Sequence, residues 1–305
     1  TTLAIFAVAG LGLTFRRPRA FPGAAFPTTV RSGGRMTARH ILLLGPLLLL
    51  LAVAYLLPFL GVMQWSVTLP EPGLGQYAAA LTDPLVLGVI WRTIRICVMV
   101  TVLSVAAAYV MTLIWVRGGP VARVVIELCI LIPFWISVLT RAFGWLALLS
   151  NKGILNTWLQ HLGILSEPLT LVRNEFGVVV GMVHFLIPFA VFPLASSMRA
   201  VDERVLMAAR SMGASRARIF WQVFVPMTRG GILGAVLLVF VFALGFFITP
   251  AILGGGRSVM VAELIYLRIF QSPDWGLGAA ISVILMVTVG ALLALMLRQV
   301  RGADR

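Results

Sequence analysis

Charged residues are scarce in this sequence. Asp, Glu, Lys and Arg make up only 11% of its 305 residues, whereas 60% are apolar and the mean hydropathy is +1.04. A soluble globular domain has roughly a quarter of its residues charged, so this composition excludes such a domain. The sequence is typical of a membrane protein.

Side chains that carry chemistry are also scarce. Cys97 and Cys129 both lie in apolar stretches, which excludes a disulfide framework and a Cys-rich metal site. His184, the histidine inside an apolar stretch, has no acid or second histidine at helical spacing. The single lysine, Lys152, follows Asn151 and not a glycine-rich turn, so there is no Walker A loop. We therefore expect neither an enzyme nor a cofactor or metal bound by this chain.

Long apolar stretches are abundant. A helix needs about 20 apolar residues to cross ~30 Å of hydrocarbon. Six apolar stretches of this length predict an all-α membrane protein with six transmembrane helices. A basic extension, residues 1–40, precedes the first helix, and a tail, residues 298–305, follows the last one. Prolines inside the stretches predict kinked helices. The six stretches are residues 41–63, 94–116, 124–149, 177–198, 230–253 and 275–297.

Arginine is distributed unevenly along the chain. Of the 24 basic residues, 17 lie before the first stretch, in the second and fourth connections and in the tail. Cytoplasmic loops of membrane proteins retain Lys and Arg, so we expect these segments and both termini to be cytoplasmic. On a soluble chain the net charge of +14 would suggest nucleic-acid binding. The uneven distribution of arginine instead marks the cytoplasmic side of the membrane protein, so we expect no nucleic-acid partner.

The fourth connection, residues 200–229, carries helix signals. Asp202 can cap a helix start with Glu203 beside it, Arg210 suits the last turn, and Gly213 can end the helix. The apolar residues between them are predicted to share one face. They are Val205, Leu206, Ala208, Ala209 and Met212.

That face has to be covered by lipid or by a groove on a partner. Lipid-binding faces prefer Trp, Phe and Leu, so the small side chains here favour a groove on another protein. Ser215 can then cap a second helix, residues 216–225, which leads to Pro226 at the threshold of the fifth stretch.

Three segments resemble a known family. Residues 207–226, MAARSMGASRARIFWQVFVP, are similar to the EAA signature of permease subunits of binding-protein-dependent ABC importers. Residues 133–156 and 244–255 resemble the spermidine/putrescine-type branch, in particular the first of its two paired permeases. The similarity extends over about residues 41–297 and implies a type I importer permease of the bacterial inner membrane. One residue departs from the signature, since Met207 stands where it has glutamate.

The resemblance implies a set of partners. The helix at 202–213 becomes a coupling helix seated in a groove of a separate ATPase, present in two copies, which binds the ATP and Mg²⁺. A second homologous permease completes the pair, a periplasmic binding protein delivers the solute, and membrane lipid surrounds the spans. The implied coupling residues are Asp202, Glu203, Leu206, Met207, Ala208, Ala209, Arg210, Met212, Gly213, Ala214 and Pro226.

The solute is predicted only by class. Aromatic faces suit an organic ammonium, whereas Arg141 argues against a bare polycation. Members of this branch are associated with polyamines and with amino-acid-derived solutes, so we expect a small solute of that kind. Arg141 either reaches the headgroups or faces the bundle interior. The candidate residues of the translocation path are Phe134, Trp135, Ser137, Arg141, Trp145, His184, Phe247 and Thr249.

The outer connections, residues 64–92, 150–176 and 254–274, are expected to form the docking surface for the delivering protein. The main rival function is a secondary active transporter of a small organic solute. Such a transporter needs a mid-membrane Asp, Glu or paired His and inverted internal repeats, and the sequence shows neither. The acids available in the outer connections are Glu71, Asp83, Glu167, Glu175, Glu263 and Asp274.

Overall fold

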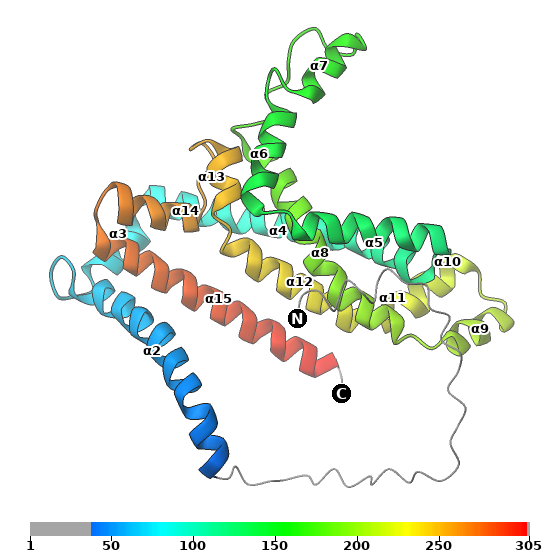
Figure 1. Ribbon diagram of the computed structural model, residues 1–305, viewed down its shortest axis with the longest axis horizontal. Coiled ribbons are helices and arrows are strands. Elements are labelled where there is room, and N and C mark those ends of the chain that lie inside the picture. The colour runs from blue at the N-terminus through cyan, green and yellow to red at the C-terminus, as the bar shows by residue number, and fades with distance from the viewer. Residues whose placement is uncertain (1–37, 304–305) are drawn as a thin grey trace. The chain divides into compact units, whose positions relative to one another are not determined.

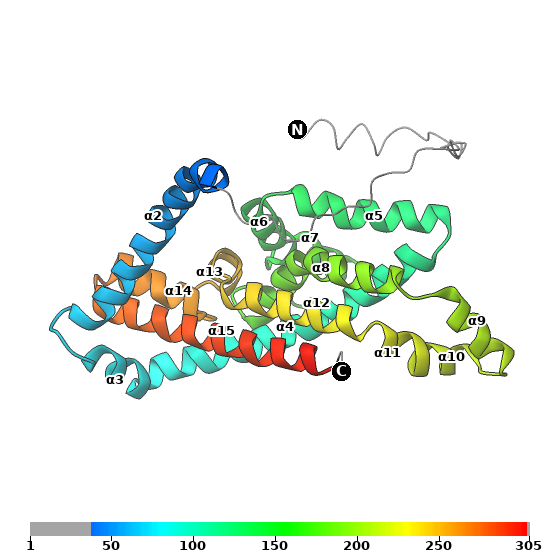
Figure 2. The same cartoon turned by 90° about the horizontal axis from the view of Figure 1, so that it is seen from below.

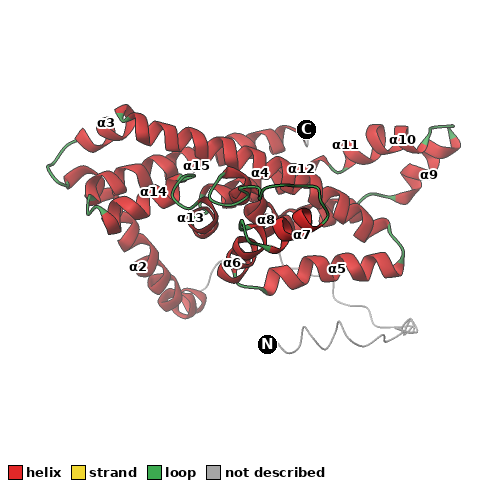
Figure 3. Ribbon diagram, turned by 90° about the horizontal axis from the view of Figure 1, so that it is seen from above, coloured by secondary structure: helices red, strands yellow, loops and turns green. Residues whose placement is uncertain are grey.

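The computed structural model describes residues 38–303, with side-chain environments from residue 44 to residue 294 and at Arg298. Most of the predicted basic extension, residues 1–40, and the end of the predicted tail lie outside this part of the chain. Every element within residues 38–303 is helical, and two elements are π-helical (Figure 3). The elements are α2 (Ala38–Thr68), α3 (Gly75–Thr82), α4 (Pro84–Arg117), α5 (Pro120–Trp135), α6 (Val138–Leu149), α7 (Ile154–His161), α8 (Glu175–Arg199), α9 (Glu203–Ser211), α10 (Arg216–Ile219), η1 (Phe220–Phe224), α11 (Val225–Met227), α12 (Arg229–Leu244), α13 (Ile248–Gly254), α14 (Val261–Tyr266), η2 (Leu267–Gln271) and α15 (Trp275–Ala303).

Four of these helices are long and apolar enough to cross a membrane by themselves. They are α4, α8, α2 from Leu44 onward and α15 as far as Ala294. Two bent helix pairs raise the number of described spans to six if each pair is counted as one span. The predicted all-α membrane fold is therefore confirmed, while the cytoplasmic placement of both termini stays a prediction.

The third predicted span is not one straight helix. The stretch 124–149 contains the end of α5 and the whole of α6, and the chain bends by 106° between α5 and the segment that follows it. Ile136 and Ser137 adopt extended backbone conformations at the bend. Pro133, in the last turn of α5, has no N–H to donate, which weakens the helix just before it ends.

The fifth predicted span is shorter at its far end than expected. The stretch 230–253 breaks after Leu244, and α13 is a separate helix beyond Gly245. At its near end, α12 continues instead from the preceding connection, because α10, η1 and α11 lead into it through a bend of 62°. Apolar composition alone merged α12 and α13, since Gly245-Phe246-Phe247 carries no charge to mark the break.

The chain divides into two compact units, Thr1–Tyr55 and Leu56–Arg305, with the boundary inside α2. In the second unit the core forms where α4, α8 and α12 pack against one another (Figures 1 and 2). Ile96, Met182 and Val239, one from each helix, are fully buried there. A Cβ added at Gly231 of α12 would lie 2.4 Å from the Ser197 side chain of α8, so this glycine allows the close helix contact.

Short helices lie at both ends of this core. At one end, which we call the α9 end, α4 and α8 finish and α9, α10, η1 and α11 follow (Figure 2). At the other, the α14 end, α4 begins and α3, α13 and α14 pack around it and its neighbours. A second apolar cluster at the α14 end joins α3, α4, α14 and α15.

Candidate coupling helix and translocation path

Helix α9 has the boundaries that its capping residues predict. The Asp202 carboxylate accepts a hydrogen bond from the backbone N–H of Arg204 at 2.9 Å. Glu203 lies in the first turn and Arg210 in the last, where each charge favours the helix dipole. Gly213 follows with a φ of +81°, a left-handed conformation that L side chains rarely adopt. The local start and stop signals are thus confirmed.

The predicted apolar face of α9 divides into residues packed on the bundle and residues left exposed. Ala209 is buried and Leu206 is half-buried against a cluster of Met198, Val201 and Phe224. The other three residues of the predicted face point away from the bundle, because a helix lying on a bundle end can turn only a narrow strip toward it. Those exposed residues are Val205, Ala208 and Met212.

The outward side of α9 carries exposed apolar residues beside exposed charged ones such as Arg204. Met212 is 82% exposed and Met207 is 56% exposed, although both are large apolar side chains. We call this surface the coupling face. An apolar surface on so short a helix is stable in water only at a cost, so a partner that covers it gains binding free energy. The coupling face comprises Val205, Met207, Ala208 and Met212.

Charged and aromatic contacts connect α9 to the long helices. Arg117, the last residue of α4, contacts the Glu203 carboxylate at 2.8 Å and lies 5.4 Å from the centre of the Phe224 ring. The guanidinium of Arg199, the last residue of α8, lies over the Trp115 ring at 4.5 Å. Because Glu203 is largely exposed, the ion pair adds little stability, and its effect is to fix the position of α9 against α4.

The connection from α9 to α12 is helical with one wide turn. The Ser215 hydroxyl accepts a hydrogen bond from the Arg218 N–H at 3.3 Å, as predicted for a cap. The expected second helix, residues 216–225, contains the π-helical turn η1. Pro226 has no N–H for an α-helical bond, whereas the Val225 N–H bonds to the Phe220 carbonyl five residues back.

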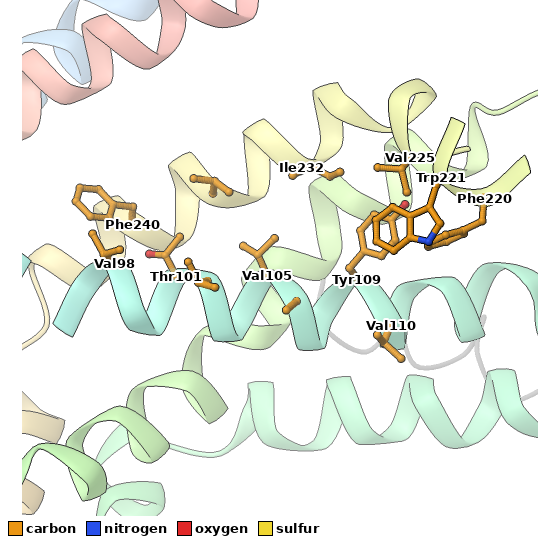
Figure 4. A pocket seen from close by; sticks show the side chains of 13 residues that line it. Val98, Thr101, Val105, Tyr109, Val110, Phe220, Trp221, Val225, Ile232 and Phe240 are labelled. Atoms are coloured by element: carbon orange, nitrogen blue, oxygen red, sulfur yellow. The ribbon is translucent and has the colours of Figure 1, made fainter. Parts of the chain in front are cut away.

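An apolar groove of about 670 Å³ lies where this connection meets α4 and α12 (Figure 4). Phe220 and Trp221 stand at one end of the groove near Tyr109, and Phe240 stands at the other. The Tyr109 and Thr228 hydroxyls are 3.1 Å apart, and the Phe220 ring meets the Tyr109 ring edge to face. These contacts join the coupling connection to the middle of α4.

Arg141 of α6 faces the bundle interior. Its guanidinium carbon lies 4.2 Å from the centre of the Phe185 ring on α8. Its Nε and Nη1 atoms are buried and have no hydrogen-bond partner among the described residues. Of the two orientations left open by the sequence, the structure has the interior one. Beside it, the Trp145 Nε1–H donates to Nδ1 of His184 at 3.1 Å, so that nitrogen of the imidazole is unprotonated.

The remaining path candidates do not all lie together. Phe134 contacts Phe189 of α8, and Trp135 and Ser137 are exposed near the bend after α5. Phe247 contacts Tyr266 instead, and Thr249 is buried beside Gly181. The sequence analysis missed the aromatic row that links Phe134 to Arg141, although its four-residue spacing on α8 and at the end of α12 was visible. That row is Phe185, Phe189, Phe242 and Phe246.

Residues 101–301 match the family described as the binding-protein-dependent transport system inner membrane component. The chain belongs to this family. The permease is 33% identical over 213 residues to the spermidine/putrescine transport system permease protein PotB of Haemophilus influenzae, covering 70% of this chain and 74% of that protein. It is 31% identical over 213 residues to PotB of Escherichia coli, covering 70% and 78%.

The permease also shares its fold with solved transporters. A chain of a bacterial alginate ABC transporter, in complex with an alginate pentasaccharide-bound periplasmic protein, matches with a TM-score of 0.71 at 14% identity, covering 85% of this chain and 93% of that one. A chain of the MetNI methionine ABC transporter matches with a TM-score of 0.55 at 14% identity, covering 73% and 100%. The type I importer permease fold is thereby confirmed.

Family membership settles the general role of the permease. It is an inner membrane component of an ABC importer and not an enzyme, since a separate ATPase hydrolyses ATP in such systems. An importer of this family works with an ATPase and a solute-binding protein. The rival function, a secondary active transporter, is excluded.

Most acids of the predicted docking surface are used within the permease itself. The Asp83 and Asp274 carboxylates cap α4 and α15, and the Glu175 carboxylate contacts the Arg95 guanidinium with both oxygens. Glu263 is buried at 6% exposure, and burial raises the pKa of its carboxyl. Of the six acids, only Glu71 and Glu167 are exposed without such contacts, so these connections have little free negative charge.

Proposed function

We propose that this permease forms part of the translocation path for a polyamine or a related small amine or amino-acid-derived solute, delivered by a periplasmic binding protein. The relatives that support the substrate class are the PotB permeases of spermidine/putrescine transport systems. A second homologous permease completes the path, and two copies of an ATPase carry the ATP and Mg²⁺. The α9 end faces the cytoplasm in this arrangement.

The coupling face is the observation on which the proposal depends. Met207 and Met212 are exposed although apolar, and Leu206 and Ala209 fix the opposite side of α9 to the bundle. A helix anchored on one side and apolar on the other suits insertion into a groove on the ATPase. Since Met207 replaces the signature's glutamate, docking at this position depends on apolar contact.

Movement of α9 has two routes into the spans. The first is the Arg117–Glu203 ion pair, which connects α9 to the end of α4. The second is the connection through η1 and α11, which reaches α4 at the Tyr109–Thr228 contact and continues into α12. ATP-driven closure of the ATPases therefore shifts α4 and α12 against α8. Helix α8 carries Phe185 and Phe189 of the aromatic row, and Arg141 contacts Phe185.

The Arg141 cluster is the proposed section of the path in this permease. Arg141, Phe185 and the Trp145–His184 pair contribute a cation, aromatic faces and an imidazole to one place between α6 and α8. Aromatic faces bind organic ammonium groups, whereas the guanidinium binds carboxylates. A solute that carries both an amine and a carboxylate uses both kinds of contact.

A charge placed on the coupling face tests the proposal. We expect Met212→Asp to reduce co-purification of the ATPase about tenfold or more, because a carboxylate has to be desolvated in an apolar groove. The matched control is Val121→Asp, since Val121 is 76% exposed at the start of α5, where an acid favours the helix dipole. Equal ATPase recovery in both variants, each correctly inserted, would show that α9 is not the docking helix.

A further inference from the structure

A recess at the α14 end is lined by three arginines and no acid. Its volume is about 660 Å³, and its walls come from the first turns of α4, the connection after α13, and the α14–η2 segment. Arg92 comes from α4, Arg257 from the connection and Arg268 from η2. Gln271 and Ser272 add polar groups to the same wall. Three elements distant in sequence thus bring positive charge to one hollow.

Few acids of the described residues form ion pairs with the three arginines of the recess. Glu175 contacts Arg95 with both carboxylate oxygens and lies 3.7 Å from the Nε of Arg92. Within residues 44–294, neither Arg257 nor Arg268 takes part in an ion pair. Glu263 of α14 is buried, does not line the recess and forms no ion pair with any of the three arginines. The recess therefore attracts an anion from outside the chain.

In the proposed orientation, the recess lies at the outer surface of the membrane. Pro84 and Gly88, which line it, precede Arg117 by about 50 and 44 Å along α4 at ~1.5 Å per residue. A bilayer with its headgroups is about 40–45 Å thick. With Arg117 at the cytoplasmic surface and α4 along the bilayer normal, the recess lies at the opposite headgroup layer and its outer edge, among short helices that do not span the membrane.

We propose that this recess receives a carboxylate side chain of the periplasmic solute-binding protein. The proposal rests on the proposed function, because it needs that partner and that orientation. Charge complementarity supports it, since arginine binds carboxylate through two parallel hydrogen bonds and an unpaired guanidinium in a hollow is preorganised for such contact. The docking surface of the permease thus presents cations, and the acids belong to the partner.

The experiment uses the assembled importer in nanodiscs of defined lipid composition. ATPase stimulation is measured as solute-loaded binding protein is titrated, for the wild type, for Arg257→Gln with Arg268→Gln, and for the matched lysine pair Arg257→Lys with Arg268→Lys. We expect the glutamine pair to weaken the apparent affinity about tenfold, with most of that loss recovered by the lysine pair. Raising the salt concentration should weaken the wild type more than the glutamine pair.

The control is Arg123→Gln, which removes an exposed cation from the first turn of α5, outside the predicted docking connections and the recess. Unchanged affinity in the glutamine pair would overturn the proposal. So would a loss that appears without binding protein and follows the phosphatidylglycerol content of the nanodiscs, because the ligand would then be a lipid headgroup. Failure of the wild type to respond to any binding protein would instead contradict the proposed function.

Discussion

The coupling face at the α9 end and the recess at the α14 end expose different kinds of side chain. At the α9 end, large apolar side chains such as Met207 and Met212 are exposed, and few contacts hold α9 in place. At the α14 end, Asp83 and Asp274 cap helices, while arginines line an open recess. The difference indicates two kinds of recognition. One end offers apolar surface that a partner buries, and the other offers charge that a partner neutralises.

The largest expected effect comes from the turn that ends α9. Gly213 has a φ of +81° and open space around its missing Cβ, so a side chain there is strained only by its backbone conformation. Gly213→Val should reduce solute uptake by about tenfold or more, because a β-branched residue is a genuine outlier at positive φ and displaces α9. Uptake into cells or proteoliposomes measures the effect.

Gly213→Asn is the matched control, because asparagine tolerates the left-handed conformation. It should retain most uptake, and both variants should insert normally, since no core contact changes. Normal uptake by the valine variant would contradict the role of α9 as the coupling helix and would remove the functional contrast between the two ends.

A smaller effect is expected from Asn156, which is fully buried in α7. Its side chain donates to the Ser150 and Leu169 carbonyls and accepts from the Leu169 N–H. Asn156→Leu leaves these backbone groups unpaired, at about 1–3 kcal/mol for each one that stays buried. Limited proteolysis should then cut residues 150–176 faster.

Asn151→Leu serves as the comparison, since Asn151 is exposed in the same connection. It should leave the cleavage rate unchanged. If both variants were cut at the wild-type rate, the hydrogen bonds of Asn156 would not stabilise residues 150–176.

The sequence predicted features that depend on local backbone chemistry. The caps at Asp202 and Ser215 and the stop at Gly213 were correct because each depends on a few adjacent residues. The 106° bend after α5 was not predicted, because Pro133 signals a weak point in a helix but not the angle at which the chain continues. The division of the α9 face into packed and exposed residues was also not predicted. It depends on the tertiary contacts of Leu206 with the cluster at the end of the bundle.

The candidate site shows the same division. Arg141 and His184 were singled out because polar groups are rare in apolar stretches, and the structure brings both to α8. The recess could not be predicted, because Arg92 is far in sequence from Arg257 and Arg268, and each has the ordinary alternative of a solvated charge. Convergence of distant residues on one hollow is a property of packing.

The smallest expected effect concerns Glu263, the buried acid beside the recess. Because burial raises the pKa of its carboxyl in the folded permease, ionisation is more favourable in the unfolded chain, and stability falls as pH rises above the ordinary glutamate pKa. Glu263→Gln does not titrate, so it should be more stable relative to the wild type at pH 8 than at low pH. The difference should shrink toward pH 4, where the wild-type carboxyl is protonated in both states. Thermal unfolding at both pH values measures it, and a difference independent of pH would show that Glu263 is compensated by a cation at the α14 end.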